Sequence, residues 1–197
     1  EDGFRVLSSV VNSQIDIHAQ YGGVVPEIAA RSHIEVINPV IREALTQAQC
    51  NWNDIDAIAV TYAPGLVGSL LVGTLAARAL AILRNKPLYA IHHVEAHVYA
   101  NFITESSSSA LQLPSKQPEF PLLALIVSGG HTQLVLFHGH GDYELLGQTQ
   151  DDAVGEAFDK VAKILGLPYP GGPSIAAAAK HGDPEKYHLP KAKLDNP

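Results

Sequence analysis

Apolar segments of two different periodicities alternate along this chain, and that alternation constrains its fold more than any other feature. Residues 54–62 (DIDAIAVTY) and 86–92 (KPLYAIH) have the short, β-branched character of buried strands. The glycine-opened segment 63–85 between them has helical spacing. The pattern begins again at residues 122–130 (LLALIVSGG) after an interruption. Such strand–helix alternation predicts an α/β layered fold with a mixed or parallel sheet.

The interruption, residues 105–121, divides the chain into two parts. It contains four consecutive serines and three prolines, a composition typical of loops and of disorder. We therefore expect a first α/β unit over residues 1–104, a flexible linker or insert over residues 105–121, and a second α/β unit over residues 122–197.

Two features of the first unit predict where its elements lie. Residues 3–12 (GFRVLSSVVN) resemble a strand, because β-branched side chains recur along them. A helical pattern begins at Pro26, which suits the first turn of a helix. Pro39 lies inside that pattern, so we expect the helix over residues 26–49 to be kinked or divided there.

The second unit carries signals for the ends of its helices. Residues 151–166 form an amphipathic pattern that Asp151 or Asp152 is suited to cap and Gly166 to end. A rigid glycine–proline turn follows, and residues 174–180 (SIAAAAK) predict a short helix.

Composition excludes several classes of protein. The single cysteine, Cys50, excludes an internal disulfide framework and favours a reducing compartment. No uninterrupted apolar stretch reaches the roughly 18 residues of a membrane span. The formal net charge is −7, so nucleic acid would be repelled on average and any contact with it needs a local patch or another component.

Histidines are concentrated in residues 91–102 (IHHVEAHVYANF). His93 and His97 are four residues apart, so a helix places both imidazoles on one face, where they suit one divalent metal. An ordinary helix with one buried and one exposed histidine is the commoner outcome for this spacing alone. The zinc protease pattern HExxH needs its glutamate directly after the first histidine, whereas Glu95 is two residues after His93.

Two glycine-containing turns are candidates for anion binding. In residues 127–134 (VSGGHTQL), Gly129 and Gly130 allow backbone N–H groups to approach an anion, with Ser128, His131 and Thr132 as further donors. A plain hairpin turn is the alternative that this turn by itself favours. In residues 63–69 (APGLVGS) the glycines open a helix, but neither GxGxxG nor a Walker ending is present, so helix packing is the better interpretation.

Asp159 lies on the amphipathic helix predicted over residues 151–166. Glu156 with Lys160, and Asp159 with Lys163, have the i,i+4 spacing of surface ion pairs. Local spacing therefore predicts a solvated face for Asp159.

Five segments, in this order, together resemble the tRNA adenosine threonylcarbamoyltransferase family, formerly described as O-sialoglycoprotein endopeptidases. They are YGGVVPEIAARSH, APGLVGSLLVGTLAARALA, HHVEAH, LIVSGGHTQL and DDAVGEAFDKVAKILGLPYPGGP. The resemblance covers nearly the whole chain except the serine-rich interruption. It implies an actin-like ATPase (ASKHA) fold of two ribonuclease-H-like α/β lobes, the first nearly complete here and the second partial.

The resemblance also implies an activity and a site. The reaction moves a threonylcarbamoyl group from threonylcarbamoyl-AMP to N6 of the adenosine 3′ of the tRNA anticodon, and no catalytic nucleophile is implied. One divalent metal, Fe²⁺ or Zn²⁺, is expected on His93 and His97, with a third protein ligand outside this sequence. The substrate-binding residues implied are Ile126, Val127, Ser128, Gly129, Gly130, Asp159 and Gly172, which for Asp159 replaces the surface interpretation.

Partners and state follow from the same resemblance. It implies a paralogous actin-like subunit, a small ATPase subunit and tRNA as partners. If the helix over residues 26–49 is exposed, it is a candidate surface for dimerisation with a paralogue. We expect a cytoplasmic protein without a membrane. Because the sequence contains no methionine and lacks the family's flanking segments, we expect a fragment with weak metal binding and little activity alone. A metalloendopeptidase and a non-catalytic actin-like interaction lobe stay open as alternatives.

Overall fold

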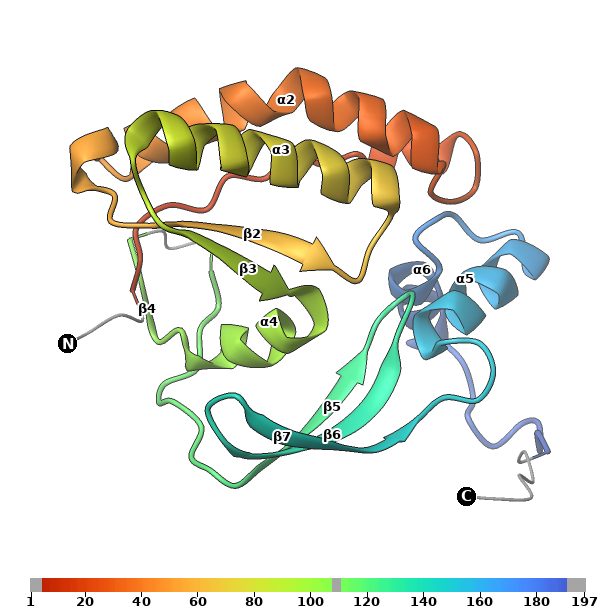
Figure 1. The fold of residues 1–197 in the computed structure, drawn as a ribbon. Helices are drawn as coiled ribbons and strands as arrows, with labels where there is room; N and C mark the ends of the chain where they lie inside the picture. The colour runs from red at the N-terminus through yellow and green to blue at the C-terminus, as the bar shows by residue number, and fades with distance from the viewer. Residues whose placement is uncertain (1–4, 108–110, 191–197) are drawn as a thin grey trace.

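The computed structural model describes residues 5–107 and 111–190 of the chain (Figure 1). Residues 1–4 of the first predicted unit, 108–110 of the predicted linker and 191–197 of the second predicted unit lie outside the described residues. In chain order the elements are β1 (Arg5–Val6), α1 (Ile15–Ala19), α2 (Pro26–Gln47), the 3-10 helix η1 (Trp52–Asp54), β2 (Ile58–Ala63), α3 (Val67–Arg84), β3 (Leu88–His92), α4 (His93–Tyr99), the 3-10 helix η2 (Ala100–Phe102), β4 (Glu105–Ser106), β5 (Leu122–Val127), β6 (Thr132–Gly139), β7 (Asp142–Gln148), α5 (Val154–Ile164) and α6 (Gly171–Ala179).

The first part of the chain is built on two parallel strands. β2 pairs with β3 in parallel, and α3 packs on β2 with α2 alongside it (Figure 1). Glycines allow the helices to pack closely, as expected for residues 63–69. A Cβ on Gly68 would lie 3.0 Å from the Ala30 Cβ, and one on Gly73 would lie 3.7 Å from a Val60 methyl group. α3 is long and apolar enough to cross a membrane by length and composition, and 11% of it is buried against the rest of the described chain. It contacts α2 and β2.

Of the two outcomes expected at Pro39, a kink or a division, the division is wrong, and so is the length predicted for the first strand. α2 runs unbroken through Pro39, so the helix is not divided. The proline removes one backbone donor, and α2 nonetheless packs against α3 as one helix. The strand predicted over residues 3–12 is limited to Arg5–Val6, the only two of its described residues with a partner strand, β4.

The second part begins with an antiparallel meander. β5 pairs with β6 and β6 with β7, and each connection is a tight turn. The α/β class is therefore confirmed. Among the described residues, however, parallel pairing is confined to the first part of the chain, and no single mixed sheet forms.

The two helices after the meander begin and end for different reasons. α5 has Ala153 as its N-cap, so capping by Asp151 or Asp152 is wrong. Instead the Thr132 hydroxyl accepts the Val154 N–H at 2.9 Å. Gly166 ends α5 as predicted, with φ of +69°. The short helix predicted at residues 174–180 is confirmed as α6, which begins three residues earlier.

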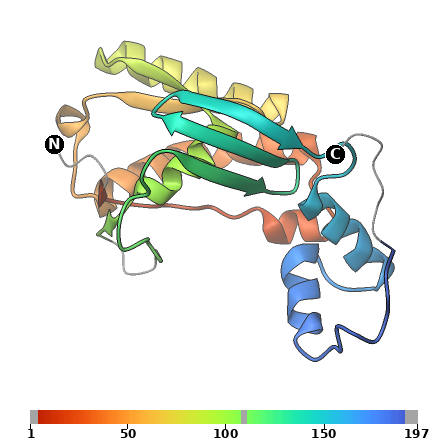
Figure 2. The ribbon, with the colours of Figure 1, turned by 90° about the horizontal axis from the view of Figure 1, so that it is seen from below.

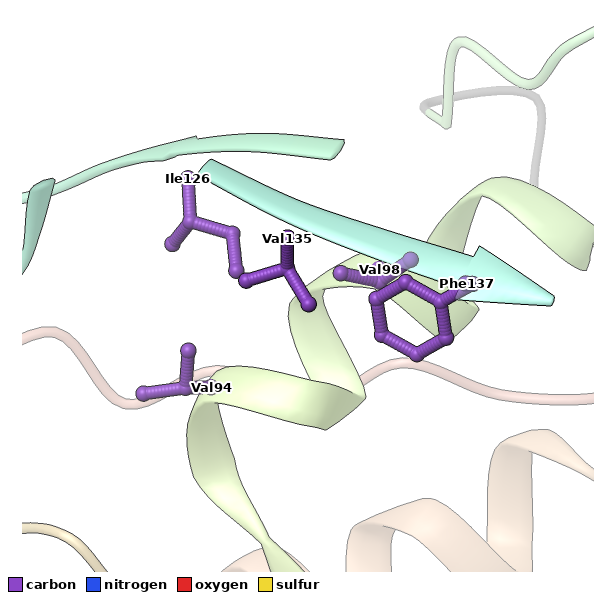
Figure 3. Close-up of a cluster of buried hydrophobic side chains, with 5 residues drawn as sticks. All are labelled: Val94, Val98, Ile126, Val135 and Phe137. Carbon is purple, nitrogen blue, oxygen red and sulfur yellow. The ribbon is translucent and has the colours of Figure 1, made fainter. Parts of the chain in front are cut away.

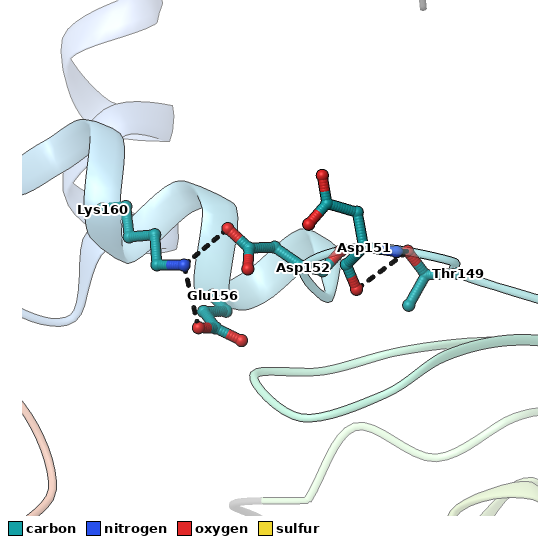
Figure 4. A network of polar contacts seen from close by, with 5 residues as sticks. All are labelled: Thr149, Asp151, Asp152, Glu156 and Lys160. Atoms are coloured by element: carbon teal, nitrogen blue, oxygen red, sulfur yellow. Dashed lines mark hydrogen bonds and ion pairs between the residues drawn. The ribbon is translucent and has the colours of Figure 1, made fainter. Parts of the chain in front are cut away.

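Asp152 contributes to the start of α5 in another way. It accepts a hydrogen bond from Lys160 Nζ at 2.6 Å, and Glu156 accepts a second at 3.1 Å (Figure 4). These hydrogen bonds, to Asp152 first and then to Glu156, raise the pKa of Lys160. The Thr149 hydroxyl donates to the Asp152 carbonyl oxygen at 3.0 Å, which holds the turn before the helix.

Helix α4 joins the two parts. It follows β3 directly and contacts β5 of the meander, which Figure 2 shows from below. Its buried residues Val94 and Val98 belong to one cluster with residues of the meander. Figure 3 shows the cluster that results, which comprises Val94, Val98, Ile126, Val135 and Phe137. The Tyr99 hydroxyl adds a polar link, because it accepts the Gly141 N–H at 3.1 Å. The histidine helix is thus fixed to the sheet that carries the glycine turn.

Candidate functional site

His93 and His97 lie on consecutive turns of α4, as their spacing predicted. Their Nε2 atoms are 3.2 Å apart and their ring centroids 4.6 Å apart. The buried residues of the same helix, Val94 and Val98, are held in the core, so the opposite face presents both imidazoles to solvent. Packing of one face of α4 therefore orients the other.

The electrostatic environment of His93 favours its neutral form. Burial lowers the pKa of His93, and the neighbouring His97, His131 and His92 lower it further, in that order. A neutral imidazole is the form that binds a metal. Two nitrogens bound to one zinc at about 2.0–2.1 Å in tetrahedral geometry lie roughly 3.3 Å apart, so the observed separation fits a pair of ligands. No group of three His, Cys, Asp or Glu residues suited to a metal occurs in the part of the chain that the structure describes.

His92 and Glu95 have other roles. The Glu95 N–H donates to His92 Nδ1 at 3.4 Å, so His92 caps α4. Glu95 lines a small cavity with His92 and Tyr143 on another side of the helix from the histidine pair. There burial and then Glu95 raise the pKa of Tyr143. Glu95 is not placed as the general base of a zinc protease.

The glycine turn after β5 is a hairpin, the alternative that the turn alone favoured. The Ser128 N–H donates to the His131 carbonyl oxygen at 2.8 Å, and Ser128 Oγ accepts the His131 N–H at 3.0 Å. The hydroxyls of Ser128 and Thr132 are thus already engaged within the protein, whereas the space in front of Gly129 and Gly130 is open. The Gly130 N–H also donates to Ser128 Oγ, at 3.3 Å, so the turn satisfies three of its own backbone donors, those of Ser128, Gly130 and His131.

Asp159 is not the surface ion-pair partner that local spacing predicted. Its Oδ1 accepts the Gly171 N–H at 2.7 Å, which places a carboxylate at the start of α6. The described ion pairs do not include one between Asp159 and Lys163. Gly172, the next residue of α6, has open space in front of it. Asp159 and the start of α6 therefore form one unit.

Two glycines that the sequence reasoning missed hold these pieces together. A Cβ on Gly155 would lie 2.6 Å from the Ser128 carbonyl oxygen, and one on Gly171 would lie 2.5 Å from the Asp159 Cα. The Gly155 N–H also donates to the Ser128 oxygen at 3.1 Å. A glycine in the first turn of an otherwise good helix is a signal of close backbone approach, and it was available in the sequence.

His97 and the end of β5, just before the two glycines of the turn, border a common cavity. An open cavity of about 580 Å³ is lined by His97 on one side and by the end of β5 through Ser128 on the other. Lys116, from the segment before β5, also lines it. The structure thus brings His97 and residues 126–128 of the predicted site to one cavity, whereas His93, Gly129 and Gly130 are not among its lining residues. Gly155 attaches α5, which carries Asp159, to the same turn.

We expect Gly155→Ala to destabilise the protein by about 1–3 kcal/mol, because its Cβ meets backbone atoms that cannot rotate away. Urea unfolding measures this. Gly147→Ala on β7 is the matched control, since nothing lies within 4 Å of its added Cβ. Equal unfolding free energies for the two variants would show that the backbone of α5 at Gly155 is not in close contact with the Ser128 turn.

The adjacent glycines of α6 give a second, internally controlled prediction. Gly171→Ala is expected to cost about 1–3 kcal/mol of unfolding free energy, because the new methyl group meets the backbone of Asp159. Gly172→Ala is expected to stabilise the helix by up to about 1 kcal/mol, since alanine is the better helix former and the space is open. Effects of the same sign in thermal unfolding would contradict this packing.

The whole described region corresponds to one family. The chain matches the family profile described as TsaD, tRNA N6-adenosine threonylcarbamoyltransferase, over residues 5–197. It is 55% identical over 195 residues to the tRNA N6-adenosine threonylcarbamoyltransferase of Symbiobacterium thermophilum. That alignment covers 99% of this chain and 54% of the relative. It is 56% identical over 192 residues to the protein of that name in Anaeromyxobacter dehalogenans strain 2CP-C, with 98% of this chain and 54% of the relative covered. For the protein of that name in Thermomicrobium roseum the identity is 55%, with 98% and 52% covered. The chain spans about half the length of the curated relatives it matches.

Proposed function

The chain belongs to the tRNA N6-adenosine threonylcarbamoyltransferase family, and from that premise we propose that the whole protein threonylcarbamoylates tRNA. The donor is threonylcarbamoyl-AMP, and the acceptor is N6 of the adenosine 3′ of the anticodon. The observation that carries the proposal is the shared cavity between His97 and the Ser128 turn, on parts of the chain fixed to one sheet. The actin-like two-lobed architecture, with the second lobe partial here, belongs to the same proposal.

The reaction depends on positioning the donor and the acceptor base, and it needs no protein nucleophile. A bond forms between N6 and the carbamoyl carbon, the bond from that carbon to the phosphate oxygen breaks, and AMP leaves with the electron pair. The proton that N6 loses goes to the departing phosphate or to water. Because the adenylate is a good leaving group, holding the two reactants in line and stabilising the charge that develops on the carbonyl oxygen is sufficient.

This chain supplies the means of holding the donor. Residues 126–128 line the cavity beside His97, and Gly129 and Gly130 continue the same turn. Gly155 attaches α5, which carries Asp159, to this turn, and Gly171 attaches α6, which carries Gly172, to Asp159. His93 and His97 would hold one divalent metal, Fe²⁺ or Zn²⁺. When bound, that metal supplies Lewis acidity next to the carbamoyl group. Further protein ligands would come from outside the described residues.

The proposal extends to partners and location. The chain carries a formal net charge of −7, so tRNA binding would depend on the rest of the protein and on partners, a paralogous actin-like subunit and a small ATPase subunit. The exposed side of α2, where Ile34 is 62% exposed, is the surface proposed for dimerisation. A cytoplasmic location is proposed on the strength of the substrate, tRNA, and of the single free cysteine, Cys50.

A reconstituted reaction separates this function from the alternatives. The whole protein, its proposed partners, threonylcarbamoyl-AMP and unmodified tRNA are incubated together, and the nucleosides are then identified by mass spectrometry. A parallel reaction contains a sialylated glycoprotein in place of tRNA. Modified adenosine with intact glycoprotein supports the transferase. Cleaved glycoprotein without modified adenosine would establish the peptidase. If neither product forms, the non-catalytic interaction lobe is the alternative that is supported.

A further inference from the structure

Glu95 has a half-buried carboxylate without a partner. In the part of the chain that the structure describes, three carboxylates are half-buried, those of Glu95, Asp152 and Asp159. Asp152 accepts a hydrogen bond from Lys160, and Asp159 accepts one from Gly171. The Glu95 carboxylate forms no hydrogen bond or ion pair with any described residue, and only its backbone N–H is engaged. Withdrawal of a carboxylate from water is costly unless a partner compensates it.

Two cavities meet at this side chain. The smaller, about 200 Å³, lies between α4 and the meander and is also lined by Tyr143. The larger, about 470 Å³, lies between β3 and α4. His92 and Glu95 line both cavities, so the two spaces adjoin at the carboxylate. Neither cavity is lined by the histidine pair or by Ser128, so a ligand here would be separate from the one in the candidate site.

The smaller cavity offers three hydrogen-bond acceptors. Glu95 contributes its carboxylate, Tyr143 its hydroxyl and Gln133 its amide oxygen. The side chains of Gln133 and Tyr143 form no hydrogen bond with any described residue. Burial, and after it the charge of Glu95, raises the pKa of Tyr143, so the carboxylate is close enough to the phenol to act on it. Three acceptors match the three N–H donors of an ammonium group.

The rest of the lining indicates an organic cation. No lysine or arginine of the described residues lines either cavity. A metal ion is unsuited, because the described residues contain no group of three metal-binding side chains. One tyrosine lines each cavity, and aromatic rings attract organic cations. The apolar lining of the larger cavity, along which an alkyl chain could lie, comprises Ala90, Ile91, Ala96, Ala100 and Ile103.

We propose that these two cavities bind a primary ammonium group on an alkyl chain. The ammonium group lies in the smaller cavity at Glu95, Gln133 and Tyr143, and the alkyl chain extends into the larger one. The single carboxylate matches the single positive charge. Lysine side chains and free polyamines both carry this group, so the test compares the two sources. The inference does not rest on the proposed function.

Calorimetric titration of the whole protein with butylammonium, 1-butanol and tetramethylammonium tests the proposal. We expect butylammonium to bind at least about tenfold more tightly than 1-butanol, because hydrogen bonds to charged groups are the stronger ones. Tetramethylammonium has the charge but no N–H donor, so it should bind at least about fivefold more weakly than butylammonium. Whichever of Nα-acetyllysine methylamide and spermidine binds more tightly then identifies the source of the group.

Variants locate the binding. Glu95→Gln should abolish the preference for butylammonium over 1-butanol, and Tyr143→Phe, which removes only a hydroxyl, should weaken butylammonium binding by about two- to fivefold. Glu144→Gln is the matched control, since Glu144 follows Tyr143 on β7 but pairs with His138. Butylammonium affinity should change by less than about twofold in this control.

Three results would overturn the proposal. The first is equal binding of butylammonium and 1-butanol, or of butylammonium and tetramethylammonium, by the unaltered protein. The second is no binding of butylammonium at about 10 mM. The third is an equal loss of affinity in Glu95→Gln and Glu144→Gln, which would indicate general attraction of cations to a protein with a net charge of −7.

Discussion

His97→Ala in the whole protein is expected to lower the rate of tRNA threonylcarbamoylation by at least about 100-fold and to remove the bound metal. A loss of 100-fold corresponds to about 2.7 kcal/mol in the activation free energy. Both imidazoles are exposed on α4, and the core side of the helix is formed by other residues, so the fold should be unaffected. His93→Ala is expected to behave in the same way.

The matched control is His138→Ala. His138 is another exposed histidine, on β6, where it pairs with Glu144. Its loss should change the rate by less than about twofold, as for most surface substitutions. Metal content by mass spectrometry and the rate of formation of modified adenosine are the two readouts. A His97→Ala protein that retains both its metal and its rate would remove the histidine pair from the site.

Phe137→Ala is expected to lower the free energy of unfolding by about 3–5 kcal/mol, a larger loss than that expected for Gly155→Ala or Gly171→Ala. Phe137 is 2% exposed and belongs to the cluster that fixes α4 to the meander. Val94 and Val98, which follow His93 and His97 on α4, belong to the cluster that would lose this ring. We therefore expect the affinity of the histidine pair for metal to fall as well, although Phe137 lies on β6 and is not itself a metal-binding residue.

Leu125→Ala is the control for this prediction, since Leu125 lies on the same sheet but is 69% exposed. Its unfolding free energy should change by less than about 1 kcal/mol. Urea denaturation gives the stabilities, and a competition assay with a chelator gives the metal affinities. If Phe137→Ala destabilised the protein no more than Leu125→Ala, α4 would not depend on the sheet for its position.

Features that depend on neighbours in sequence could be predicted. The histidine pair needed only the i,i+4 geometry of a helix, and the end of α5 needed only Gly166. The strands β2 and β3 and the helix between them were indicated by length and periodicity alone.

Features that depend on residues far apart in the sequence could not be predicted. The cap of α5 comes from Thr132, 22 residues before Val154, so the nearby Asp151 and Asp152 were misleading. Asp159 is bound by Gly171, 12 residues away, and not by Lys163 on its own helix. The first strand was overestimated because a strand needs a partner, and β4 offers only two residues.

Transfer of label from the donor to one defined base tests the central proposal most directly. The whole protein and its partners receive threonylcarbamoyl-AMP labelled with ¹⁴C in the threonyl group, together with a tRNA that has adenosine 3′ of the anticodon. A second reaction uses the same tRNA with guanosine at that position. Label that enters only the first tRNA is the predicted result. Label in neither tRNA, or equal label in both, would contradict the assignment of this chain to adenosine threonylcarbamoylation.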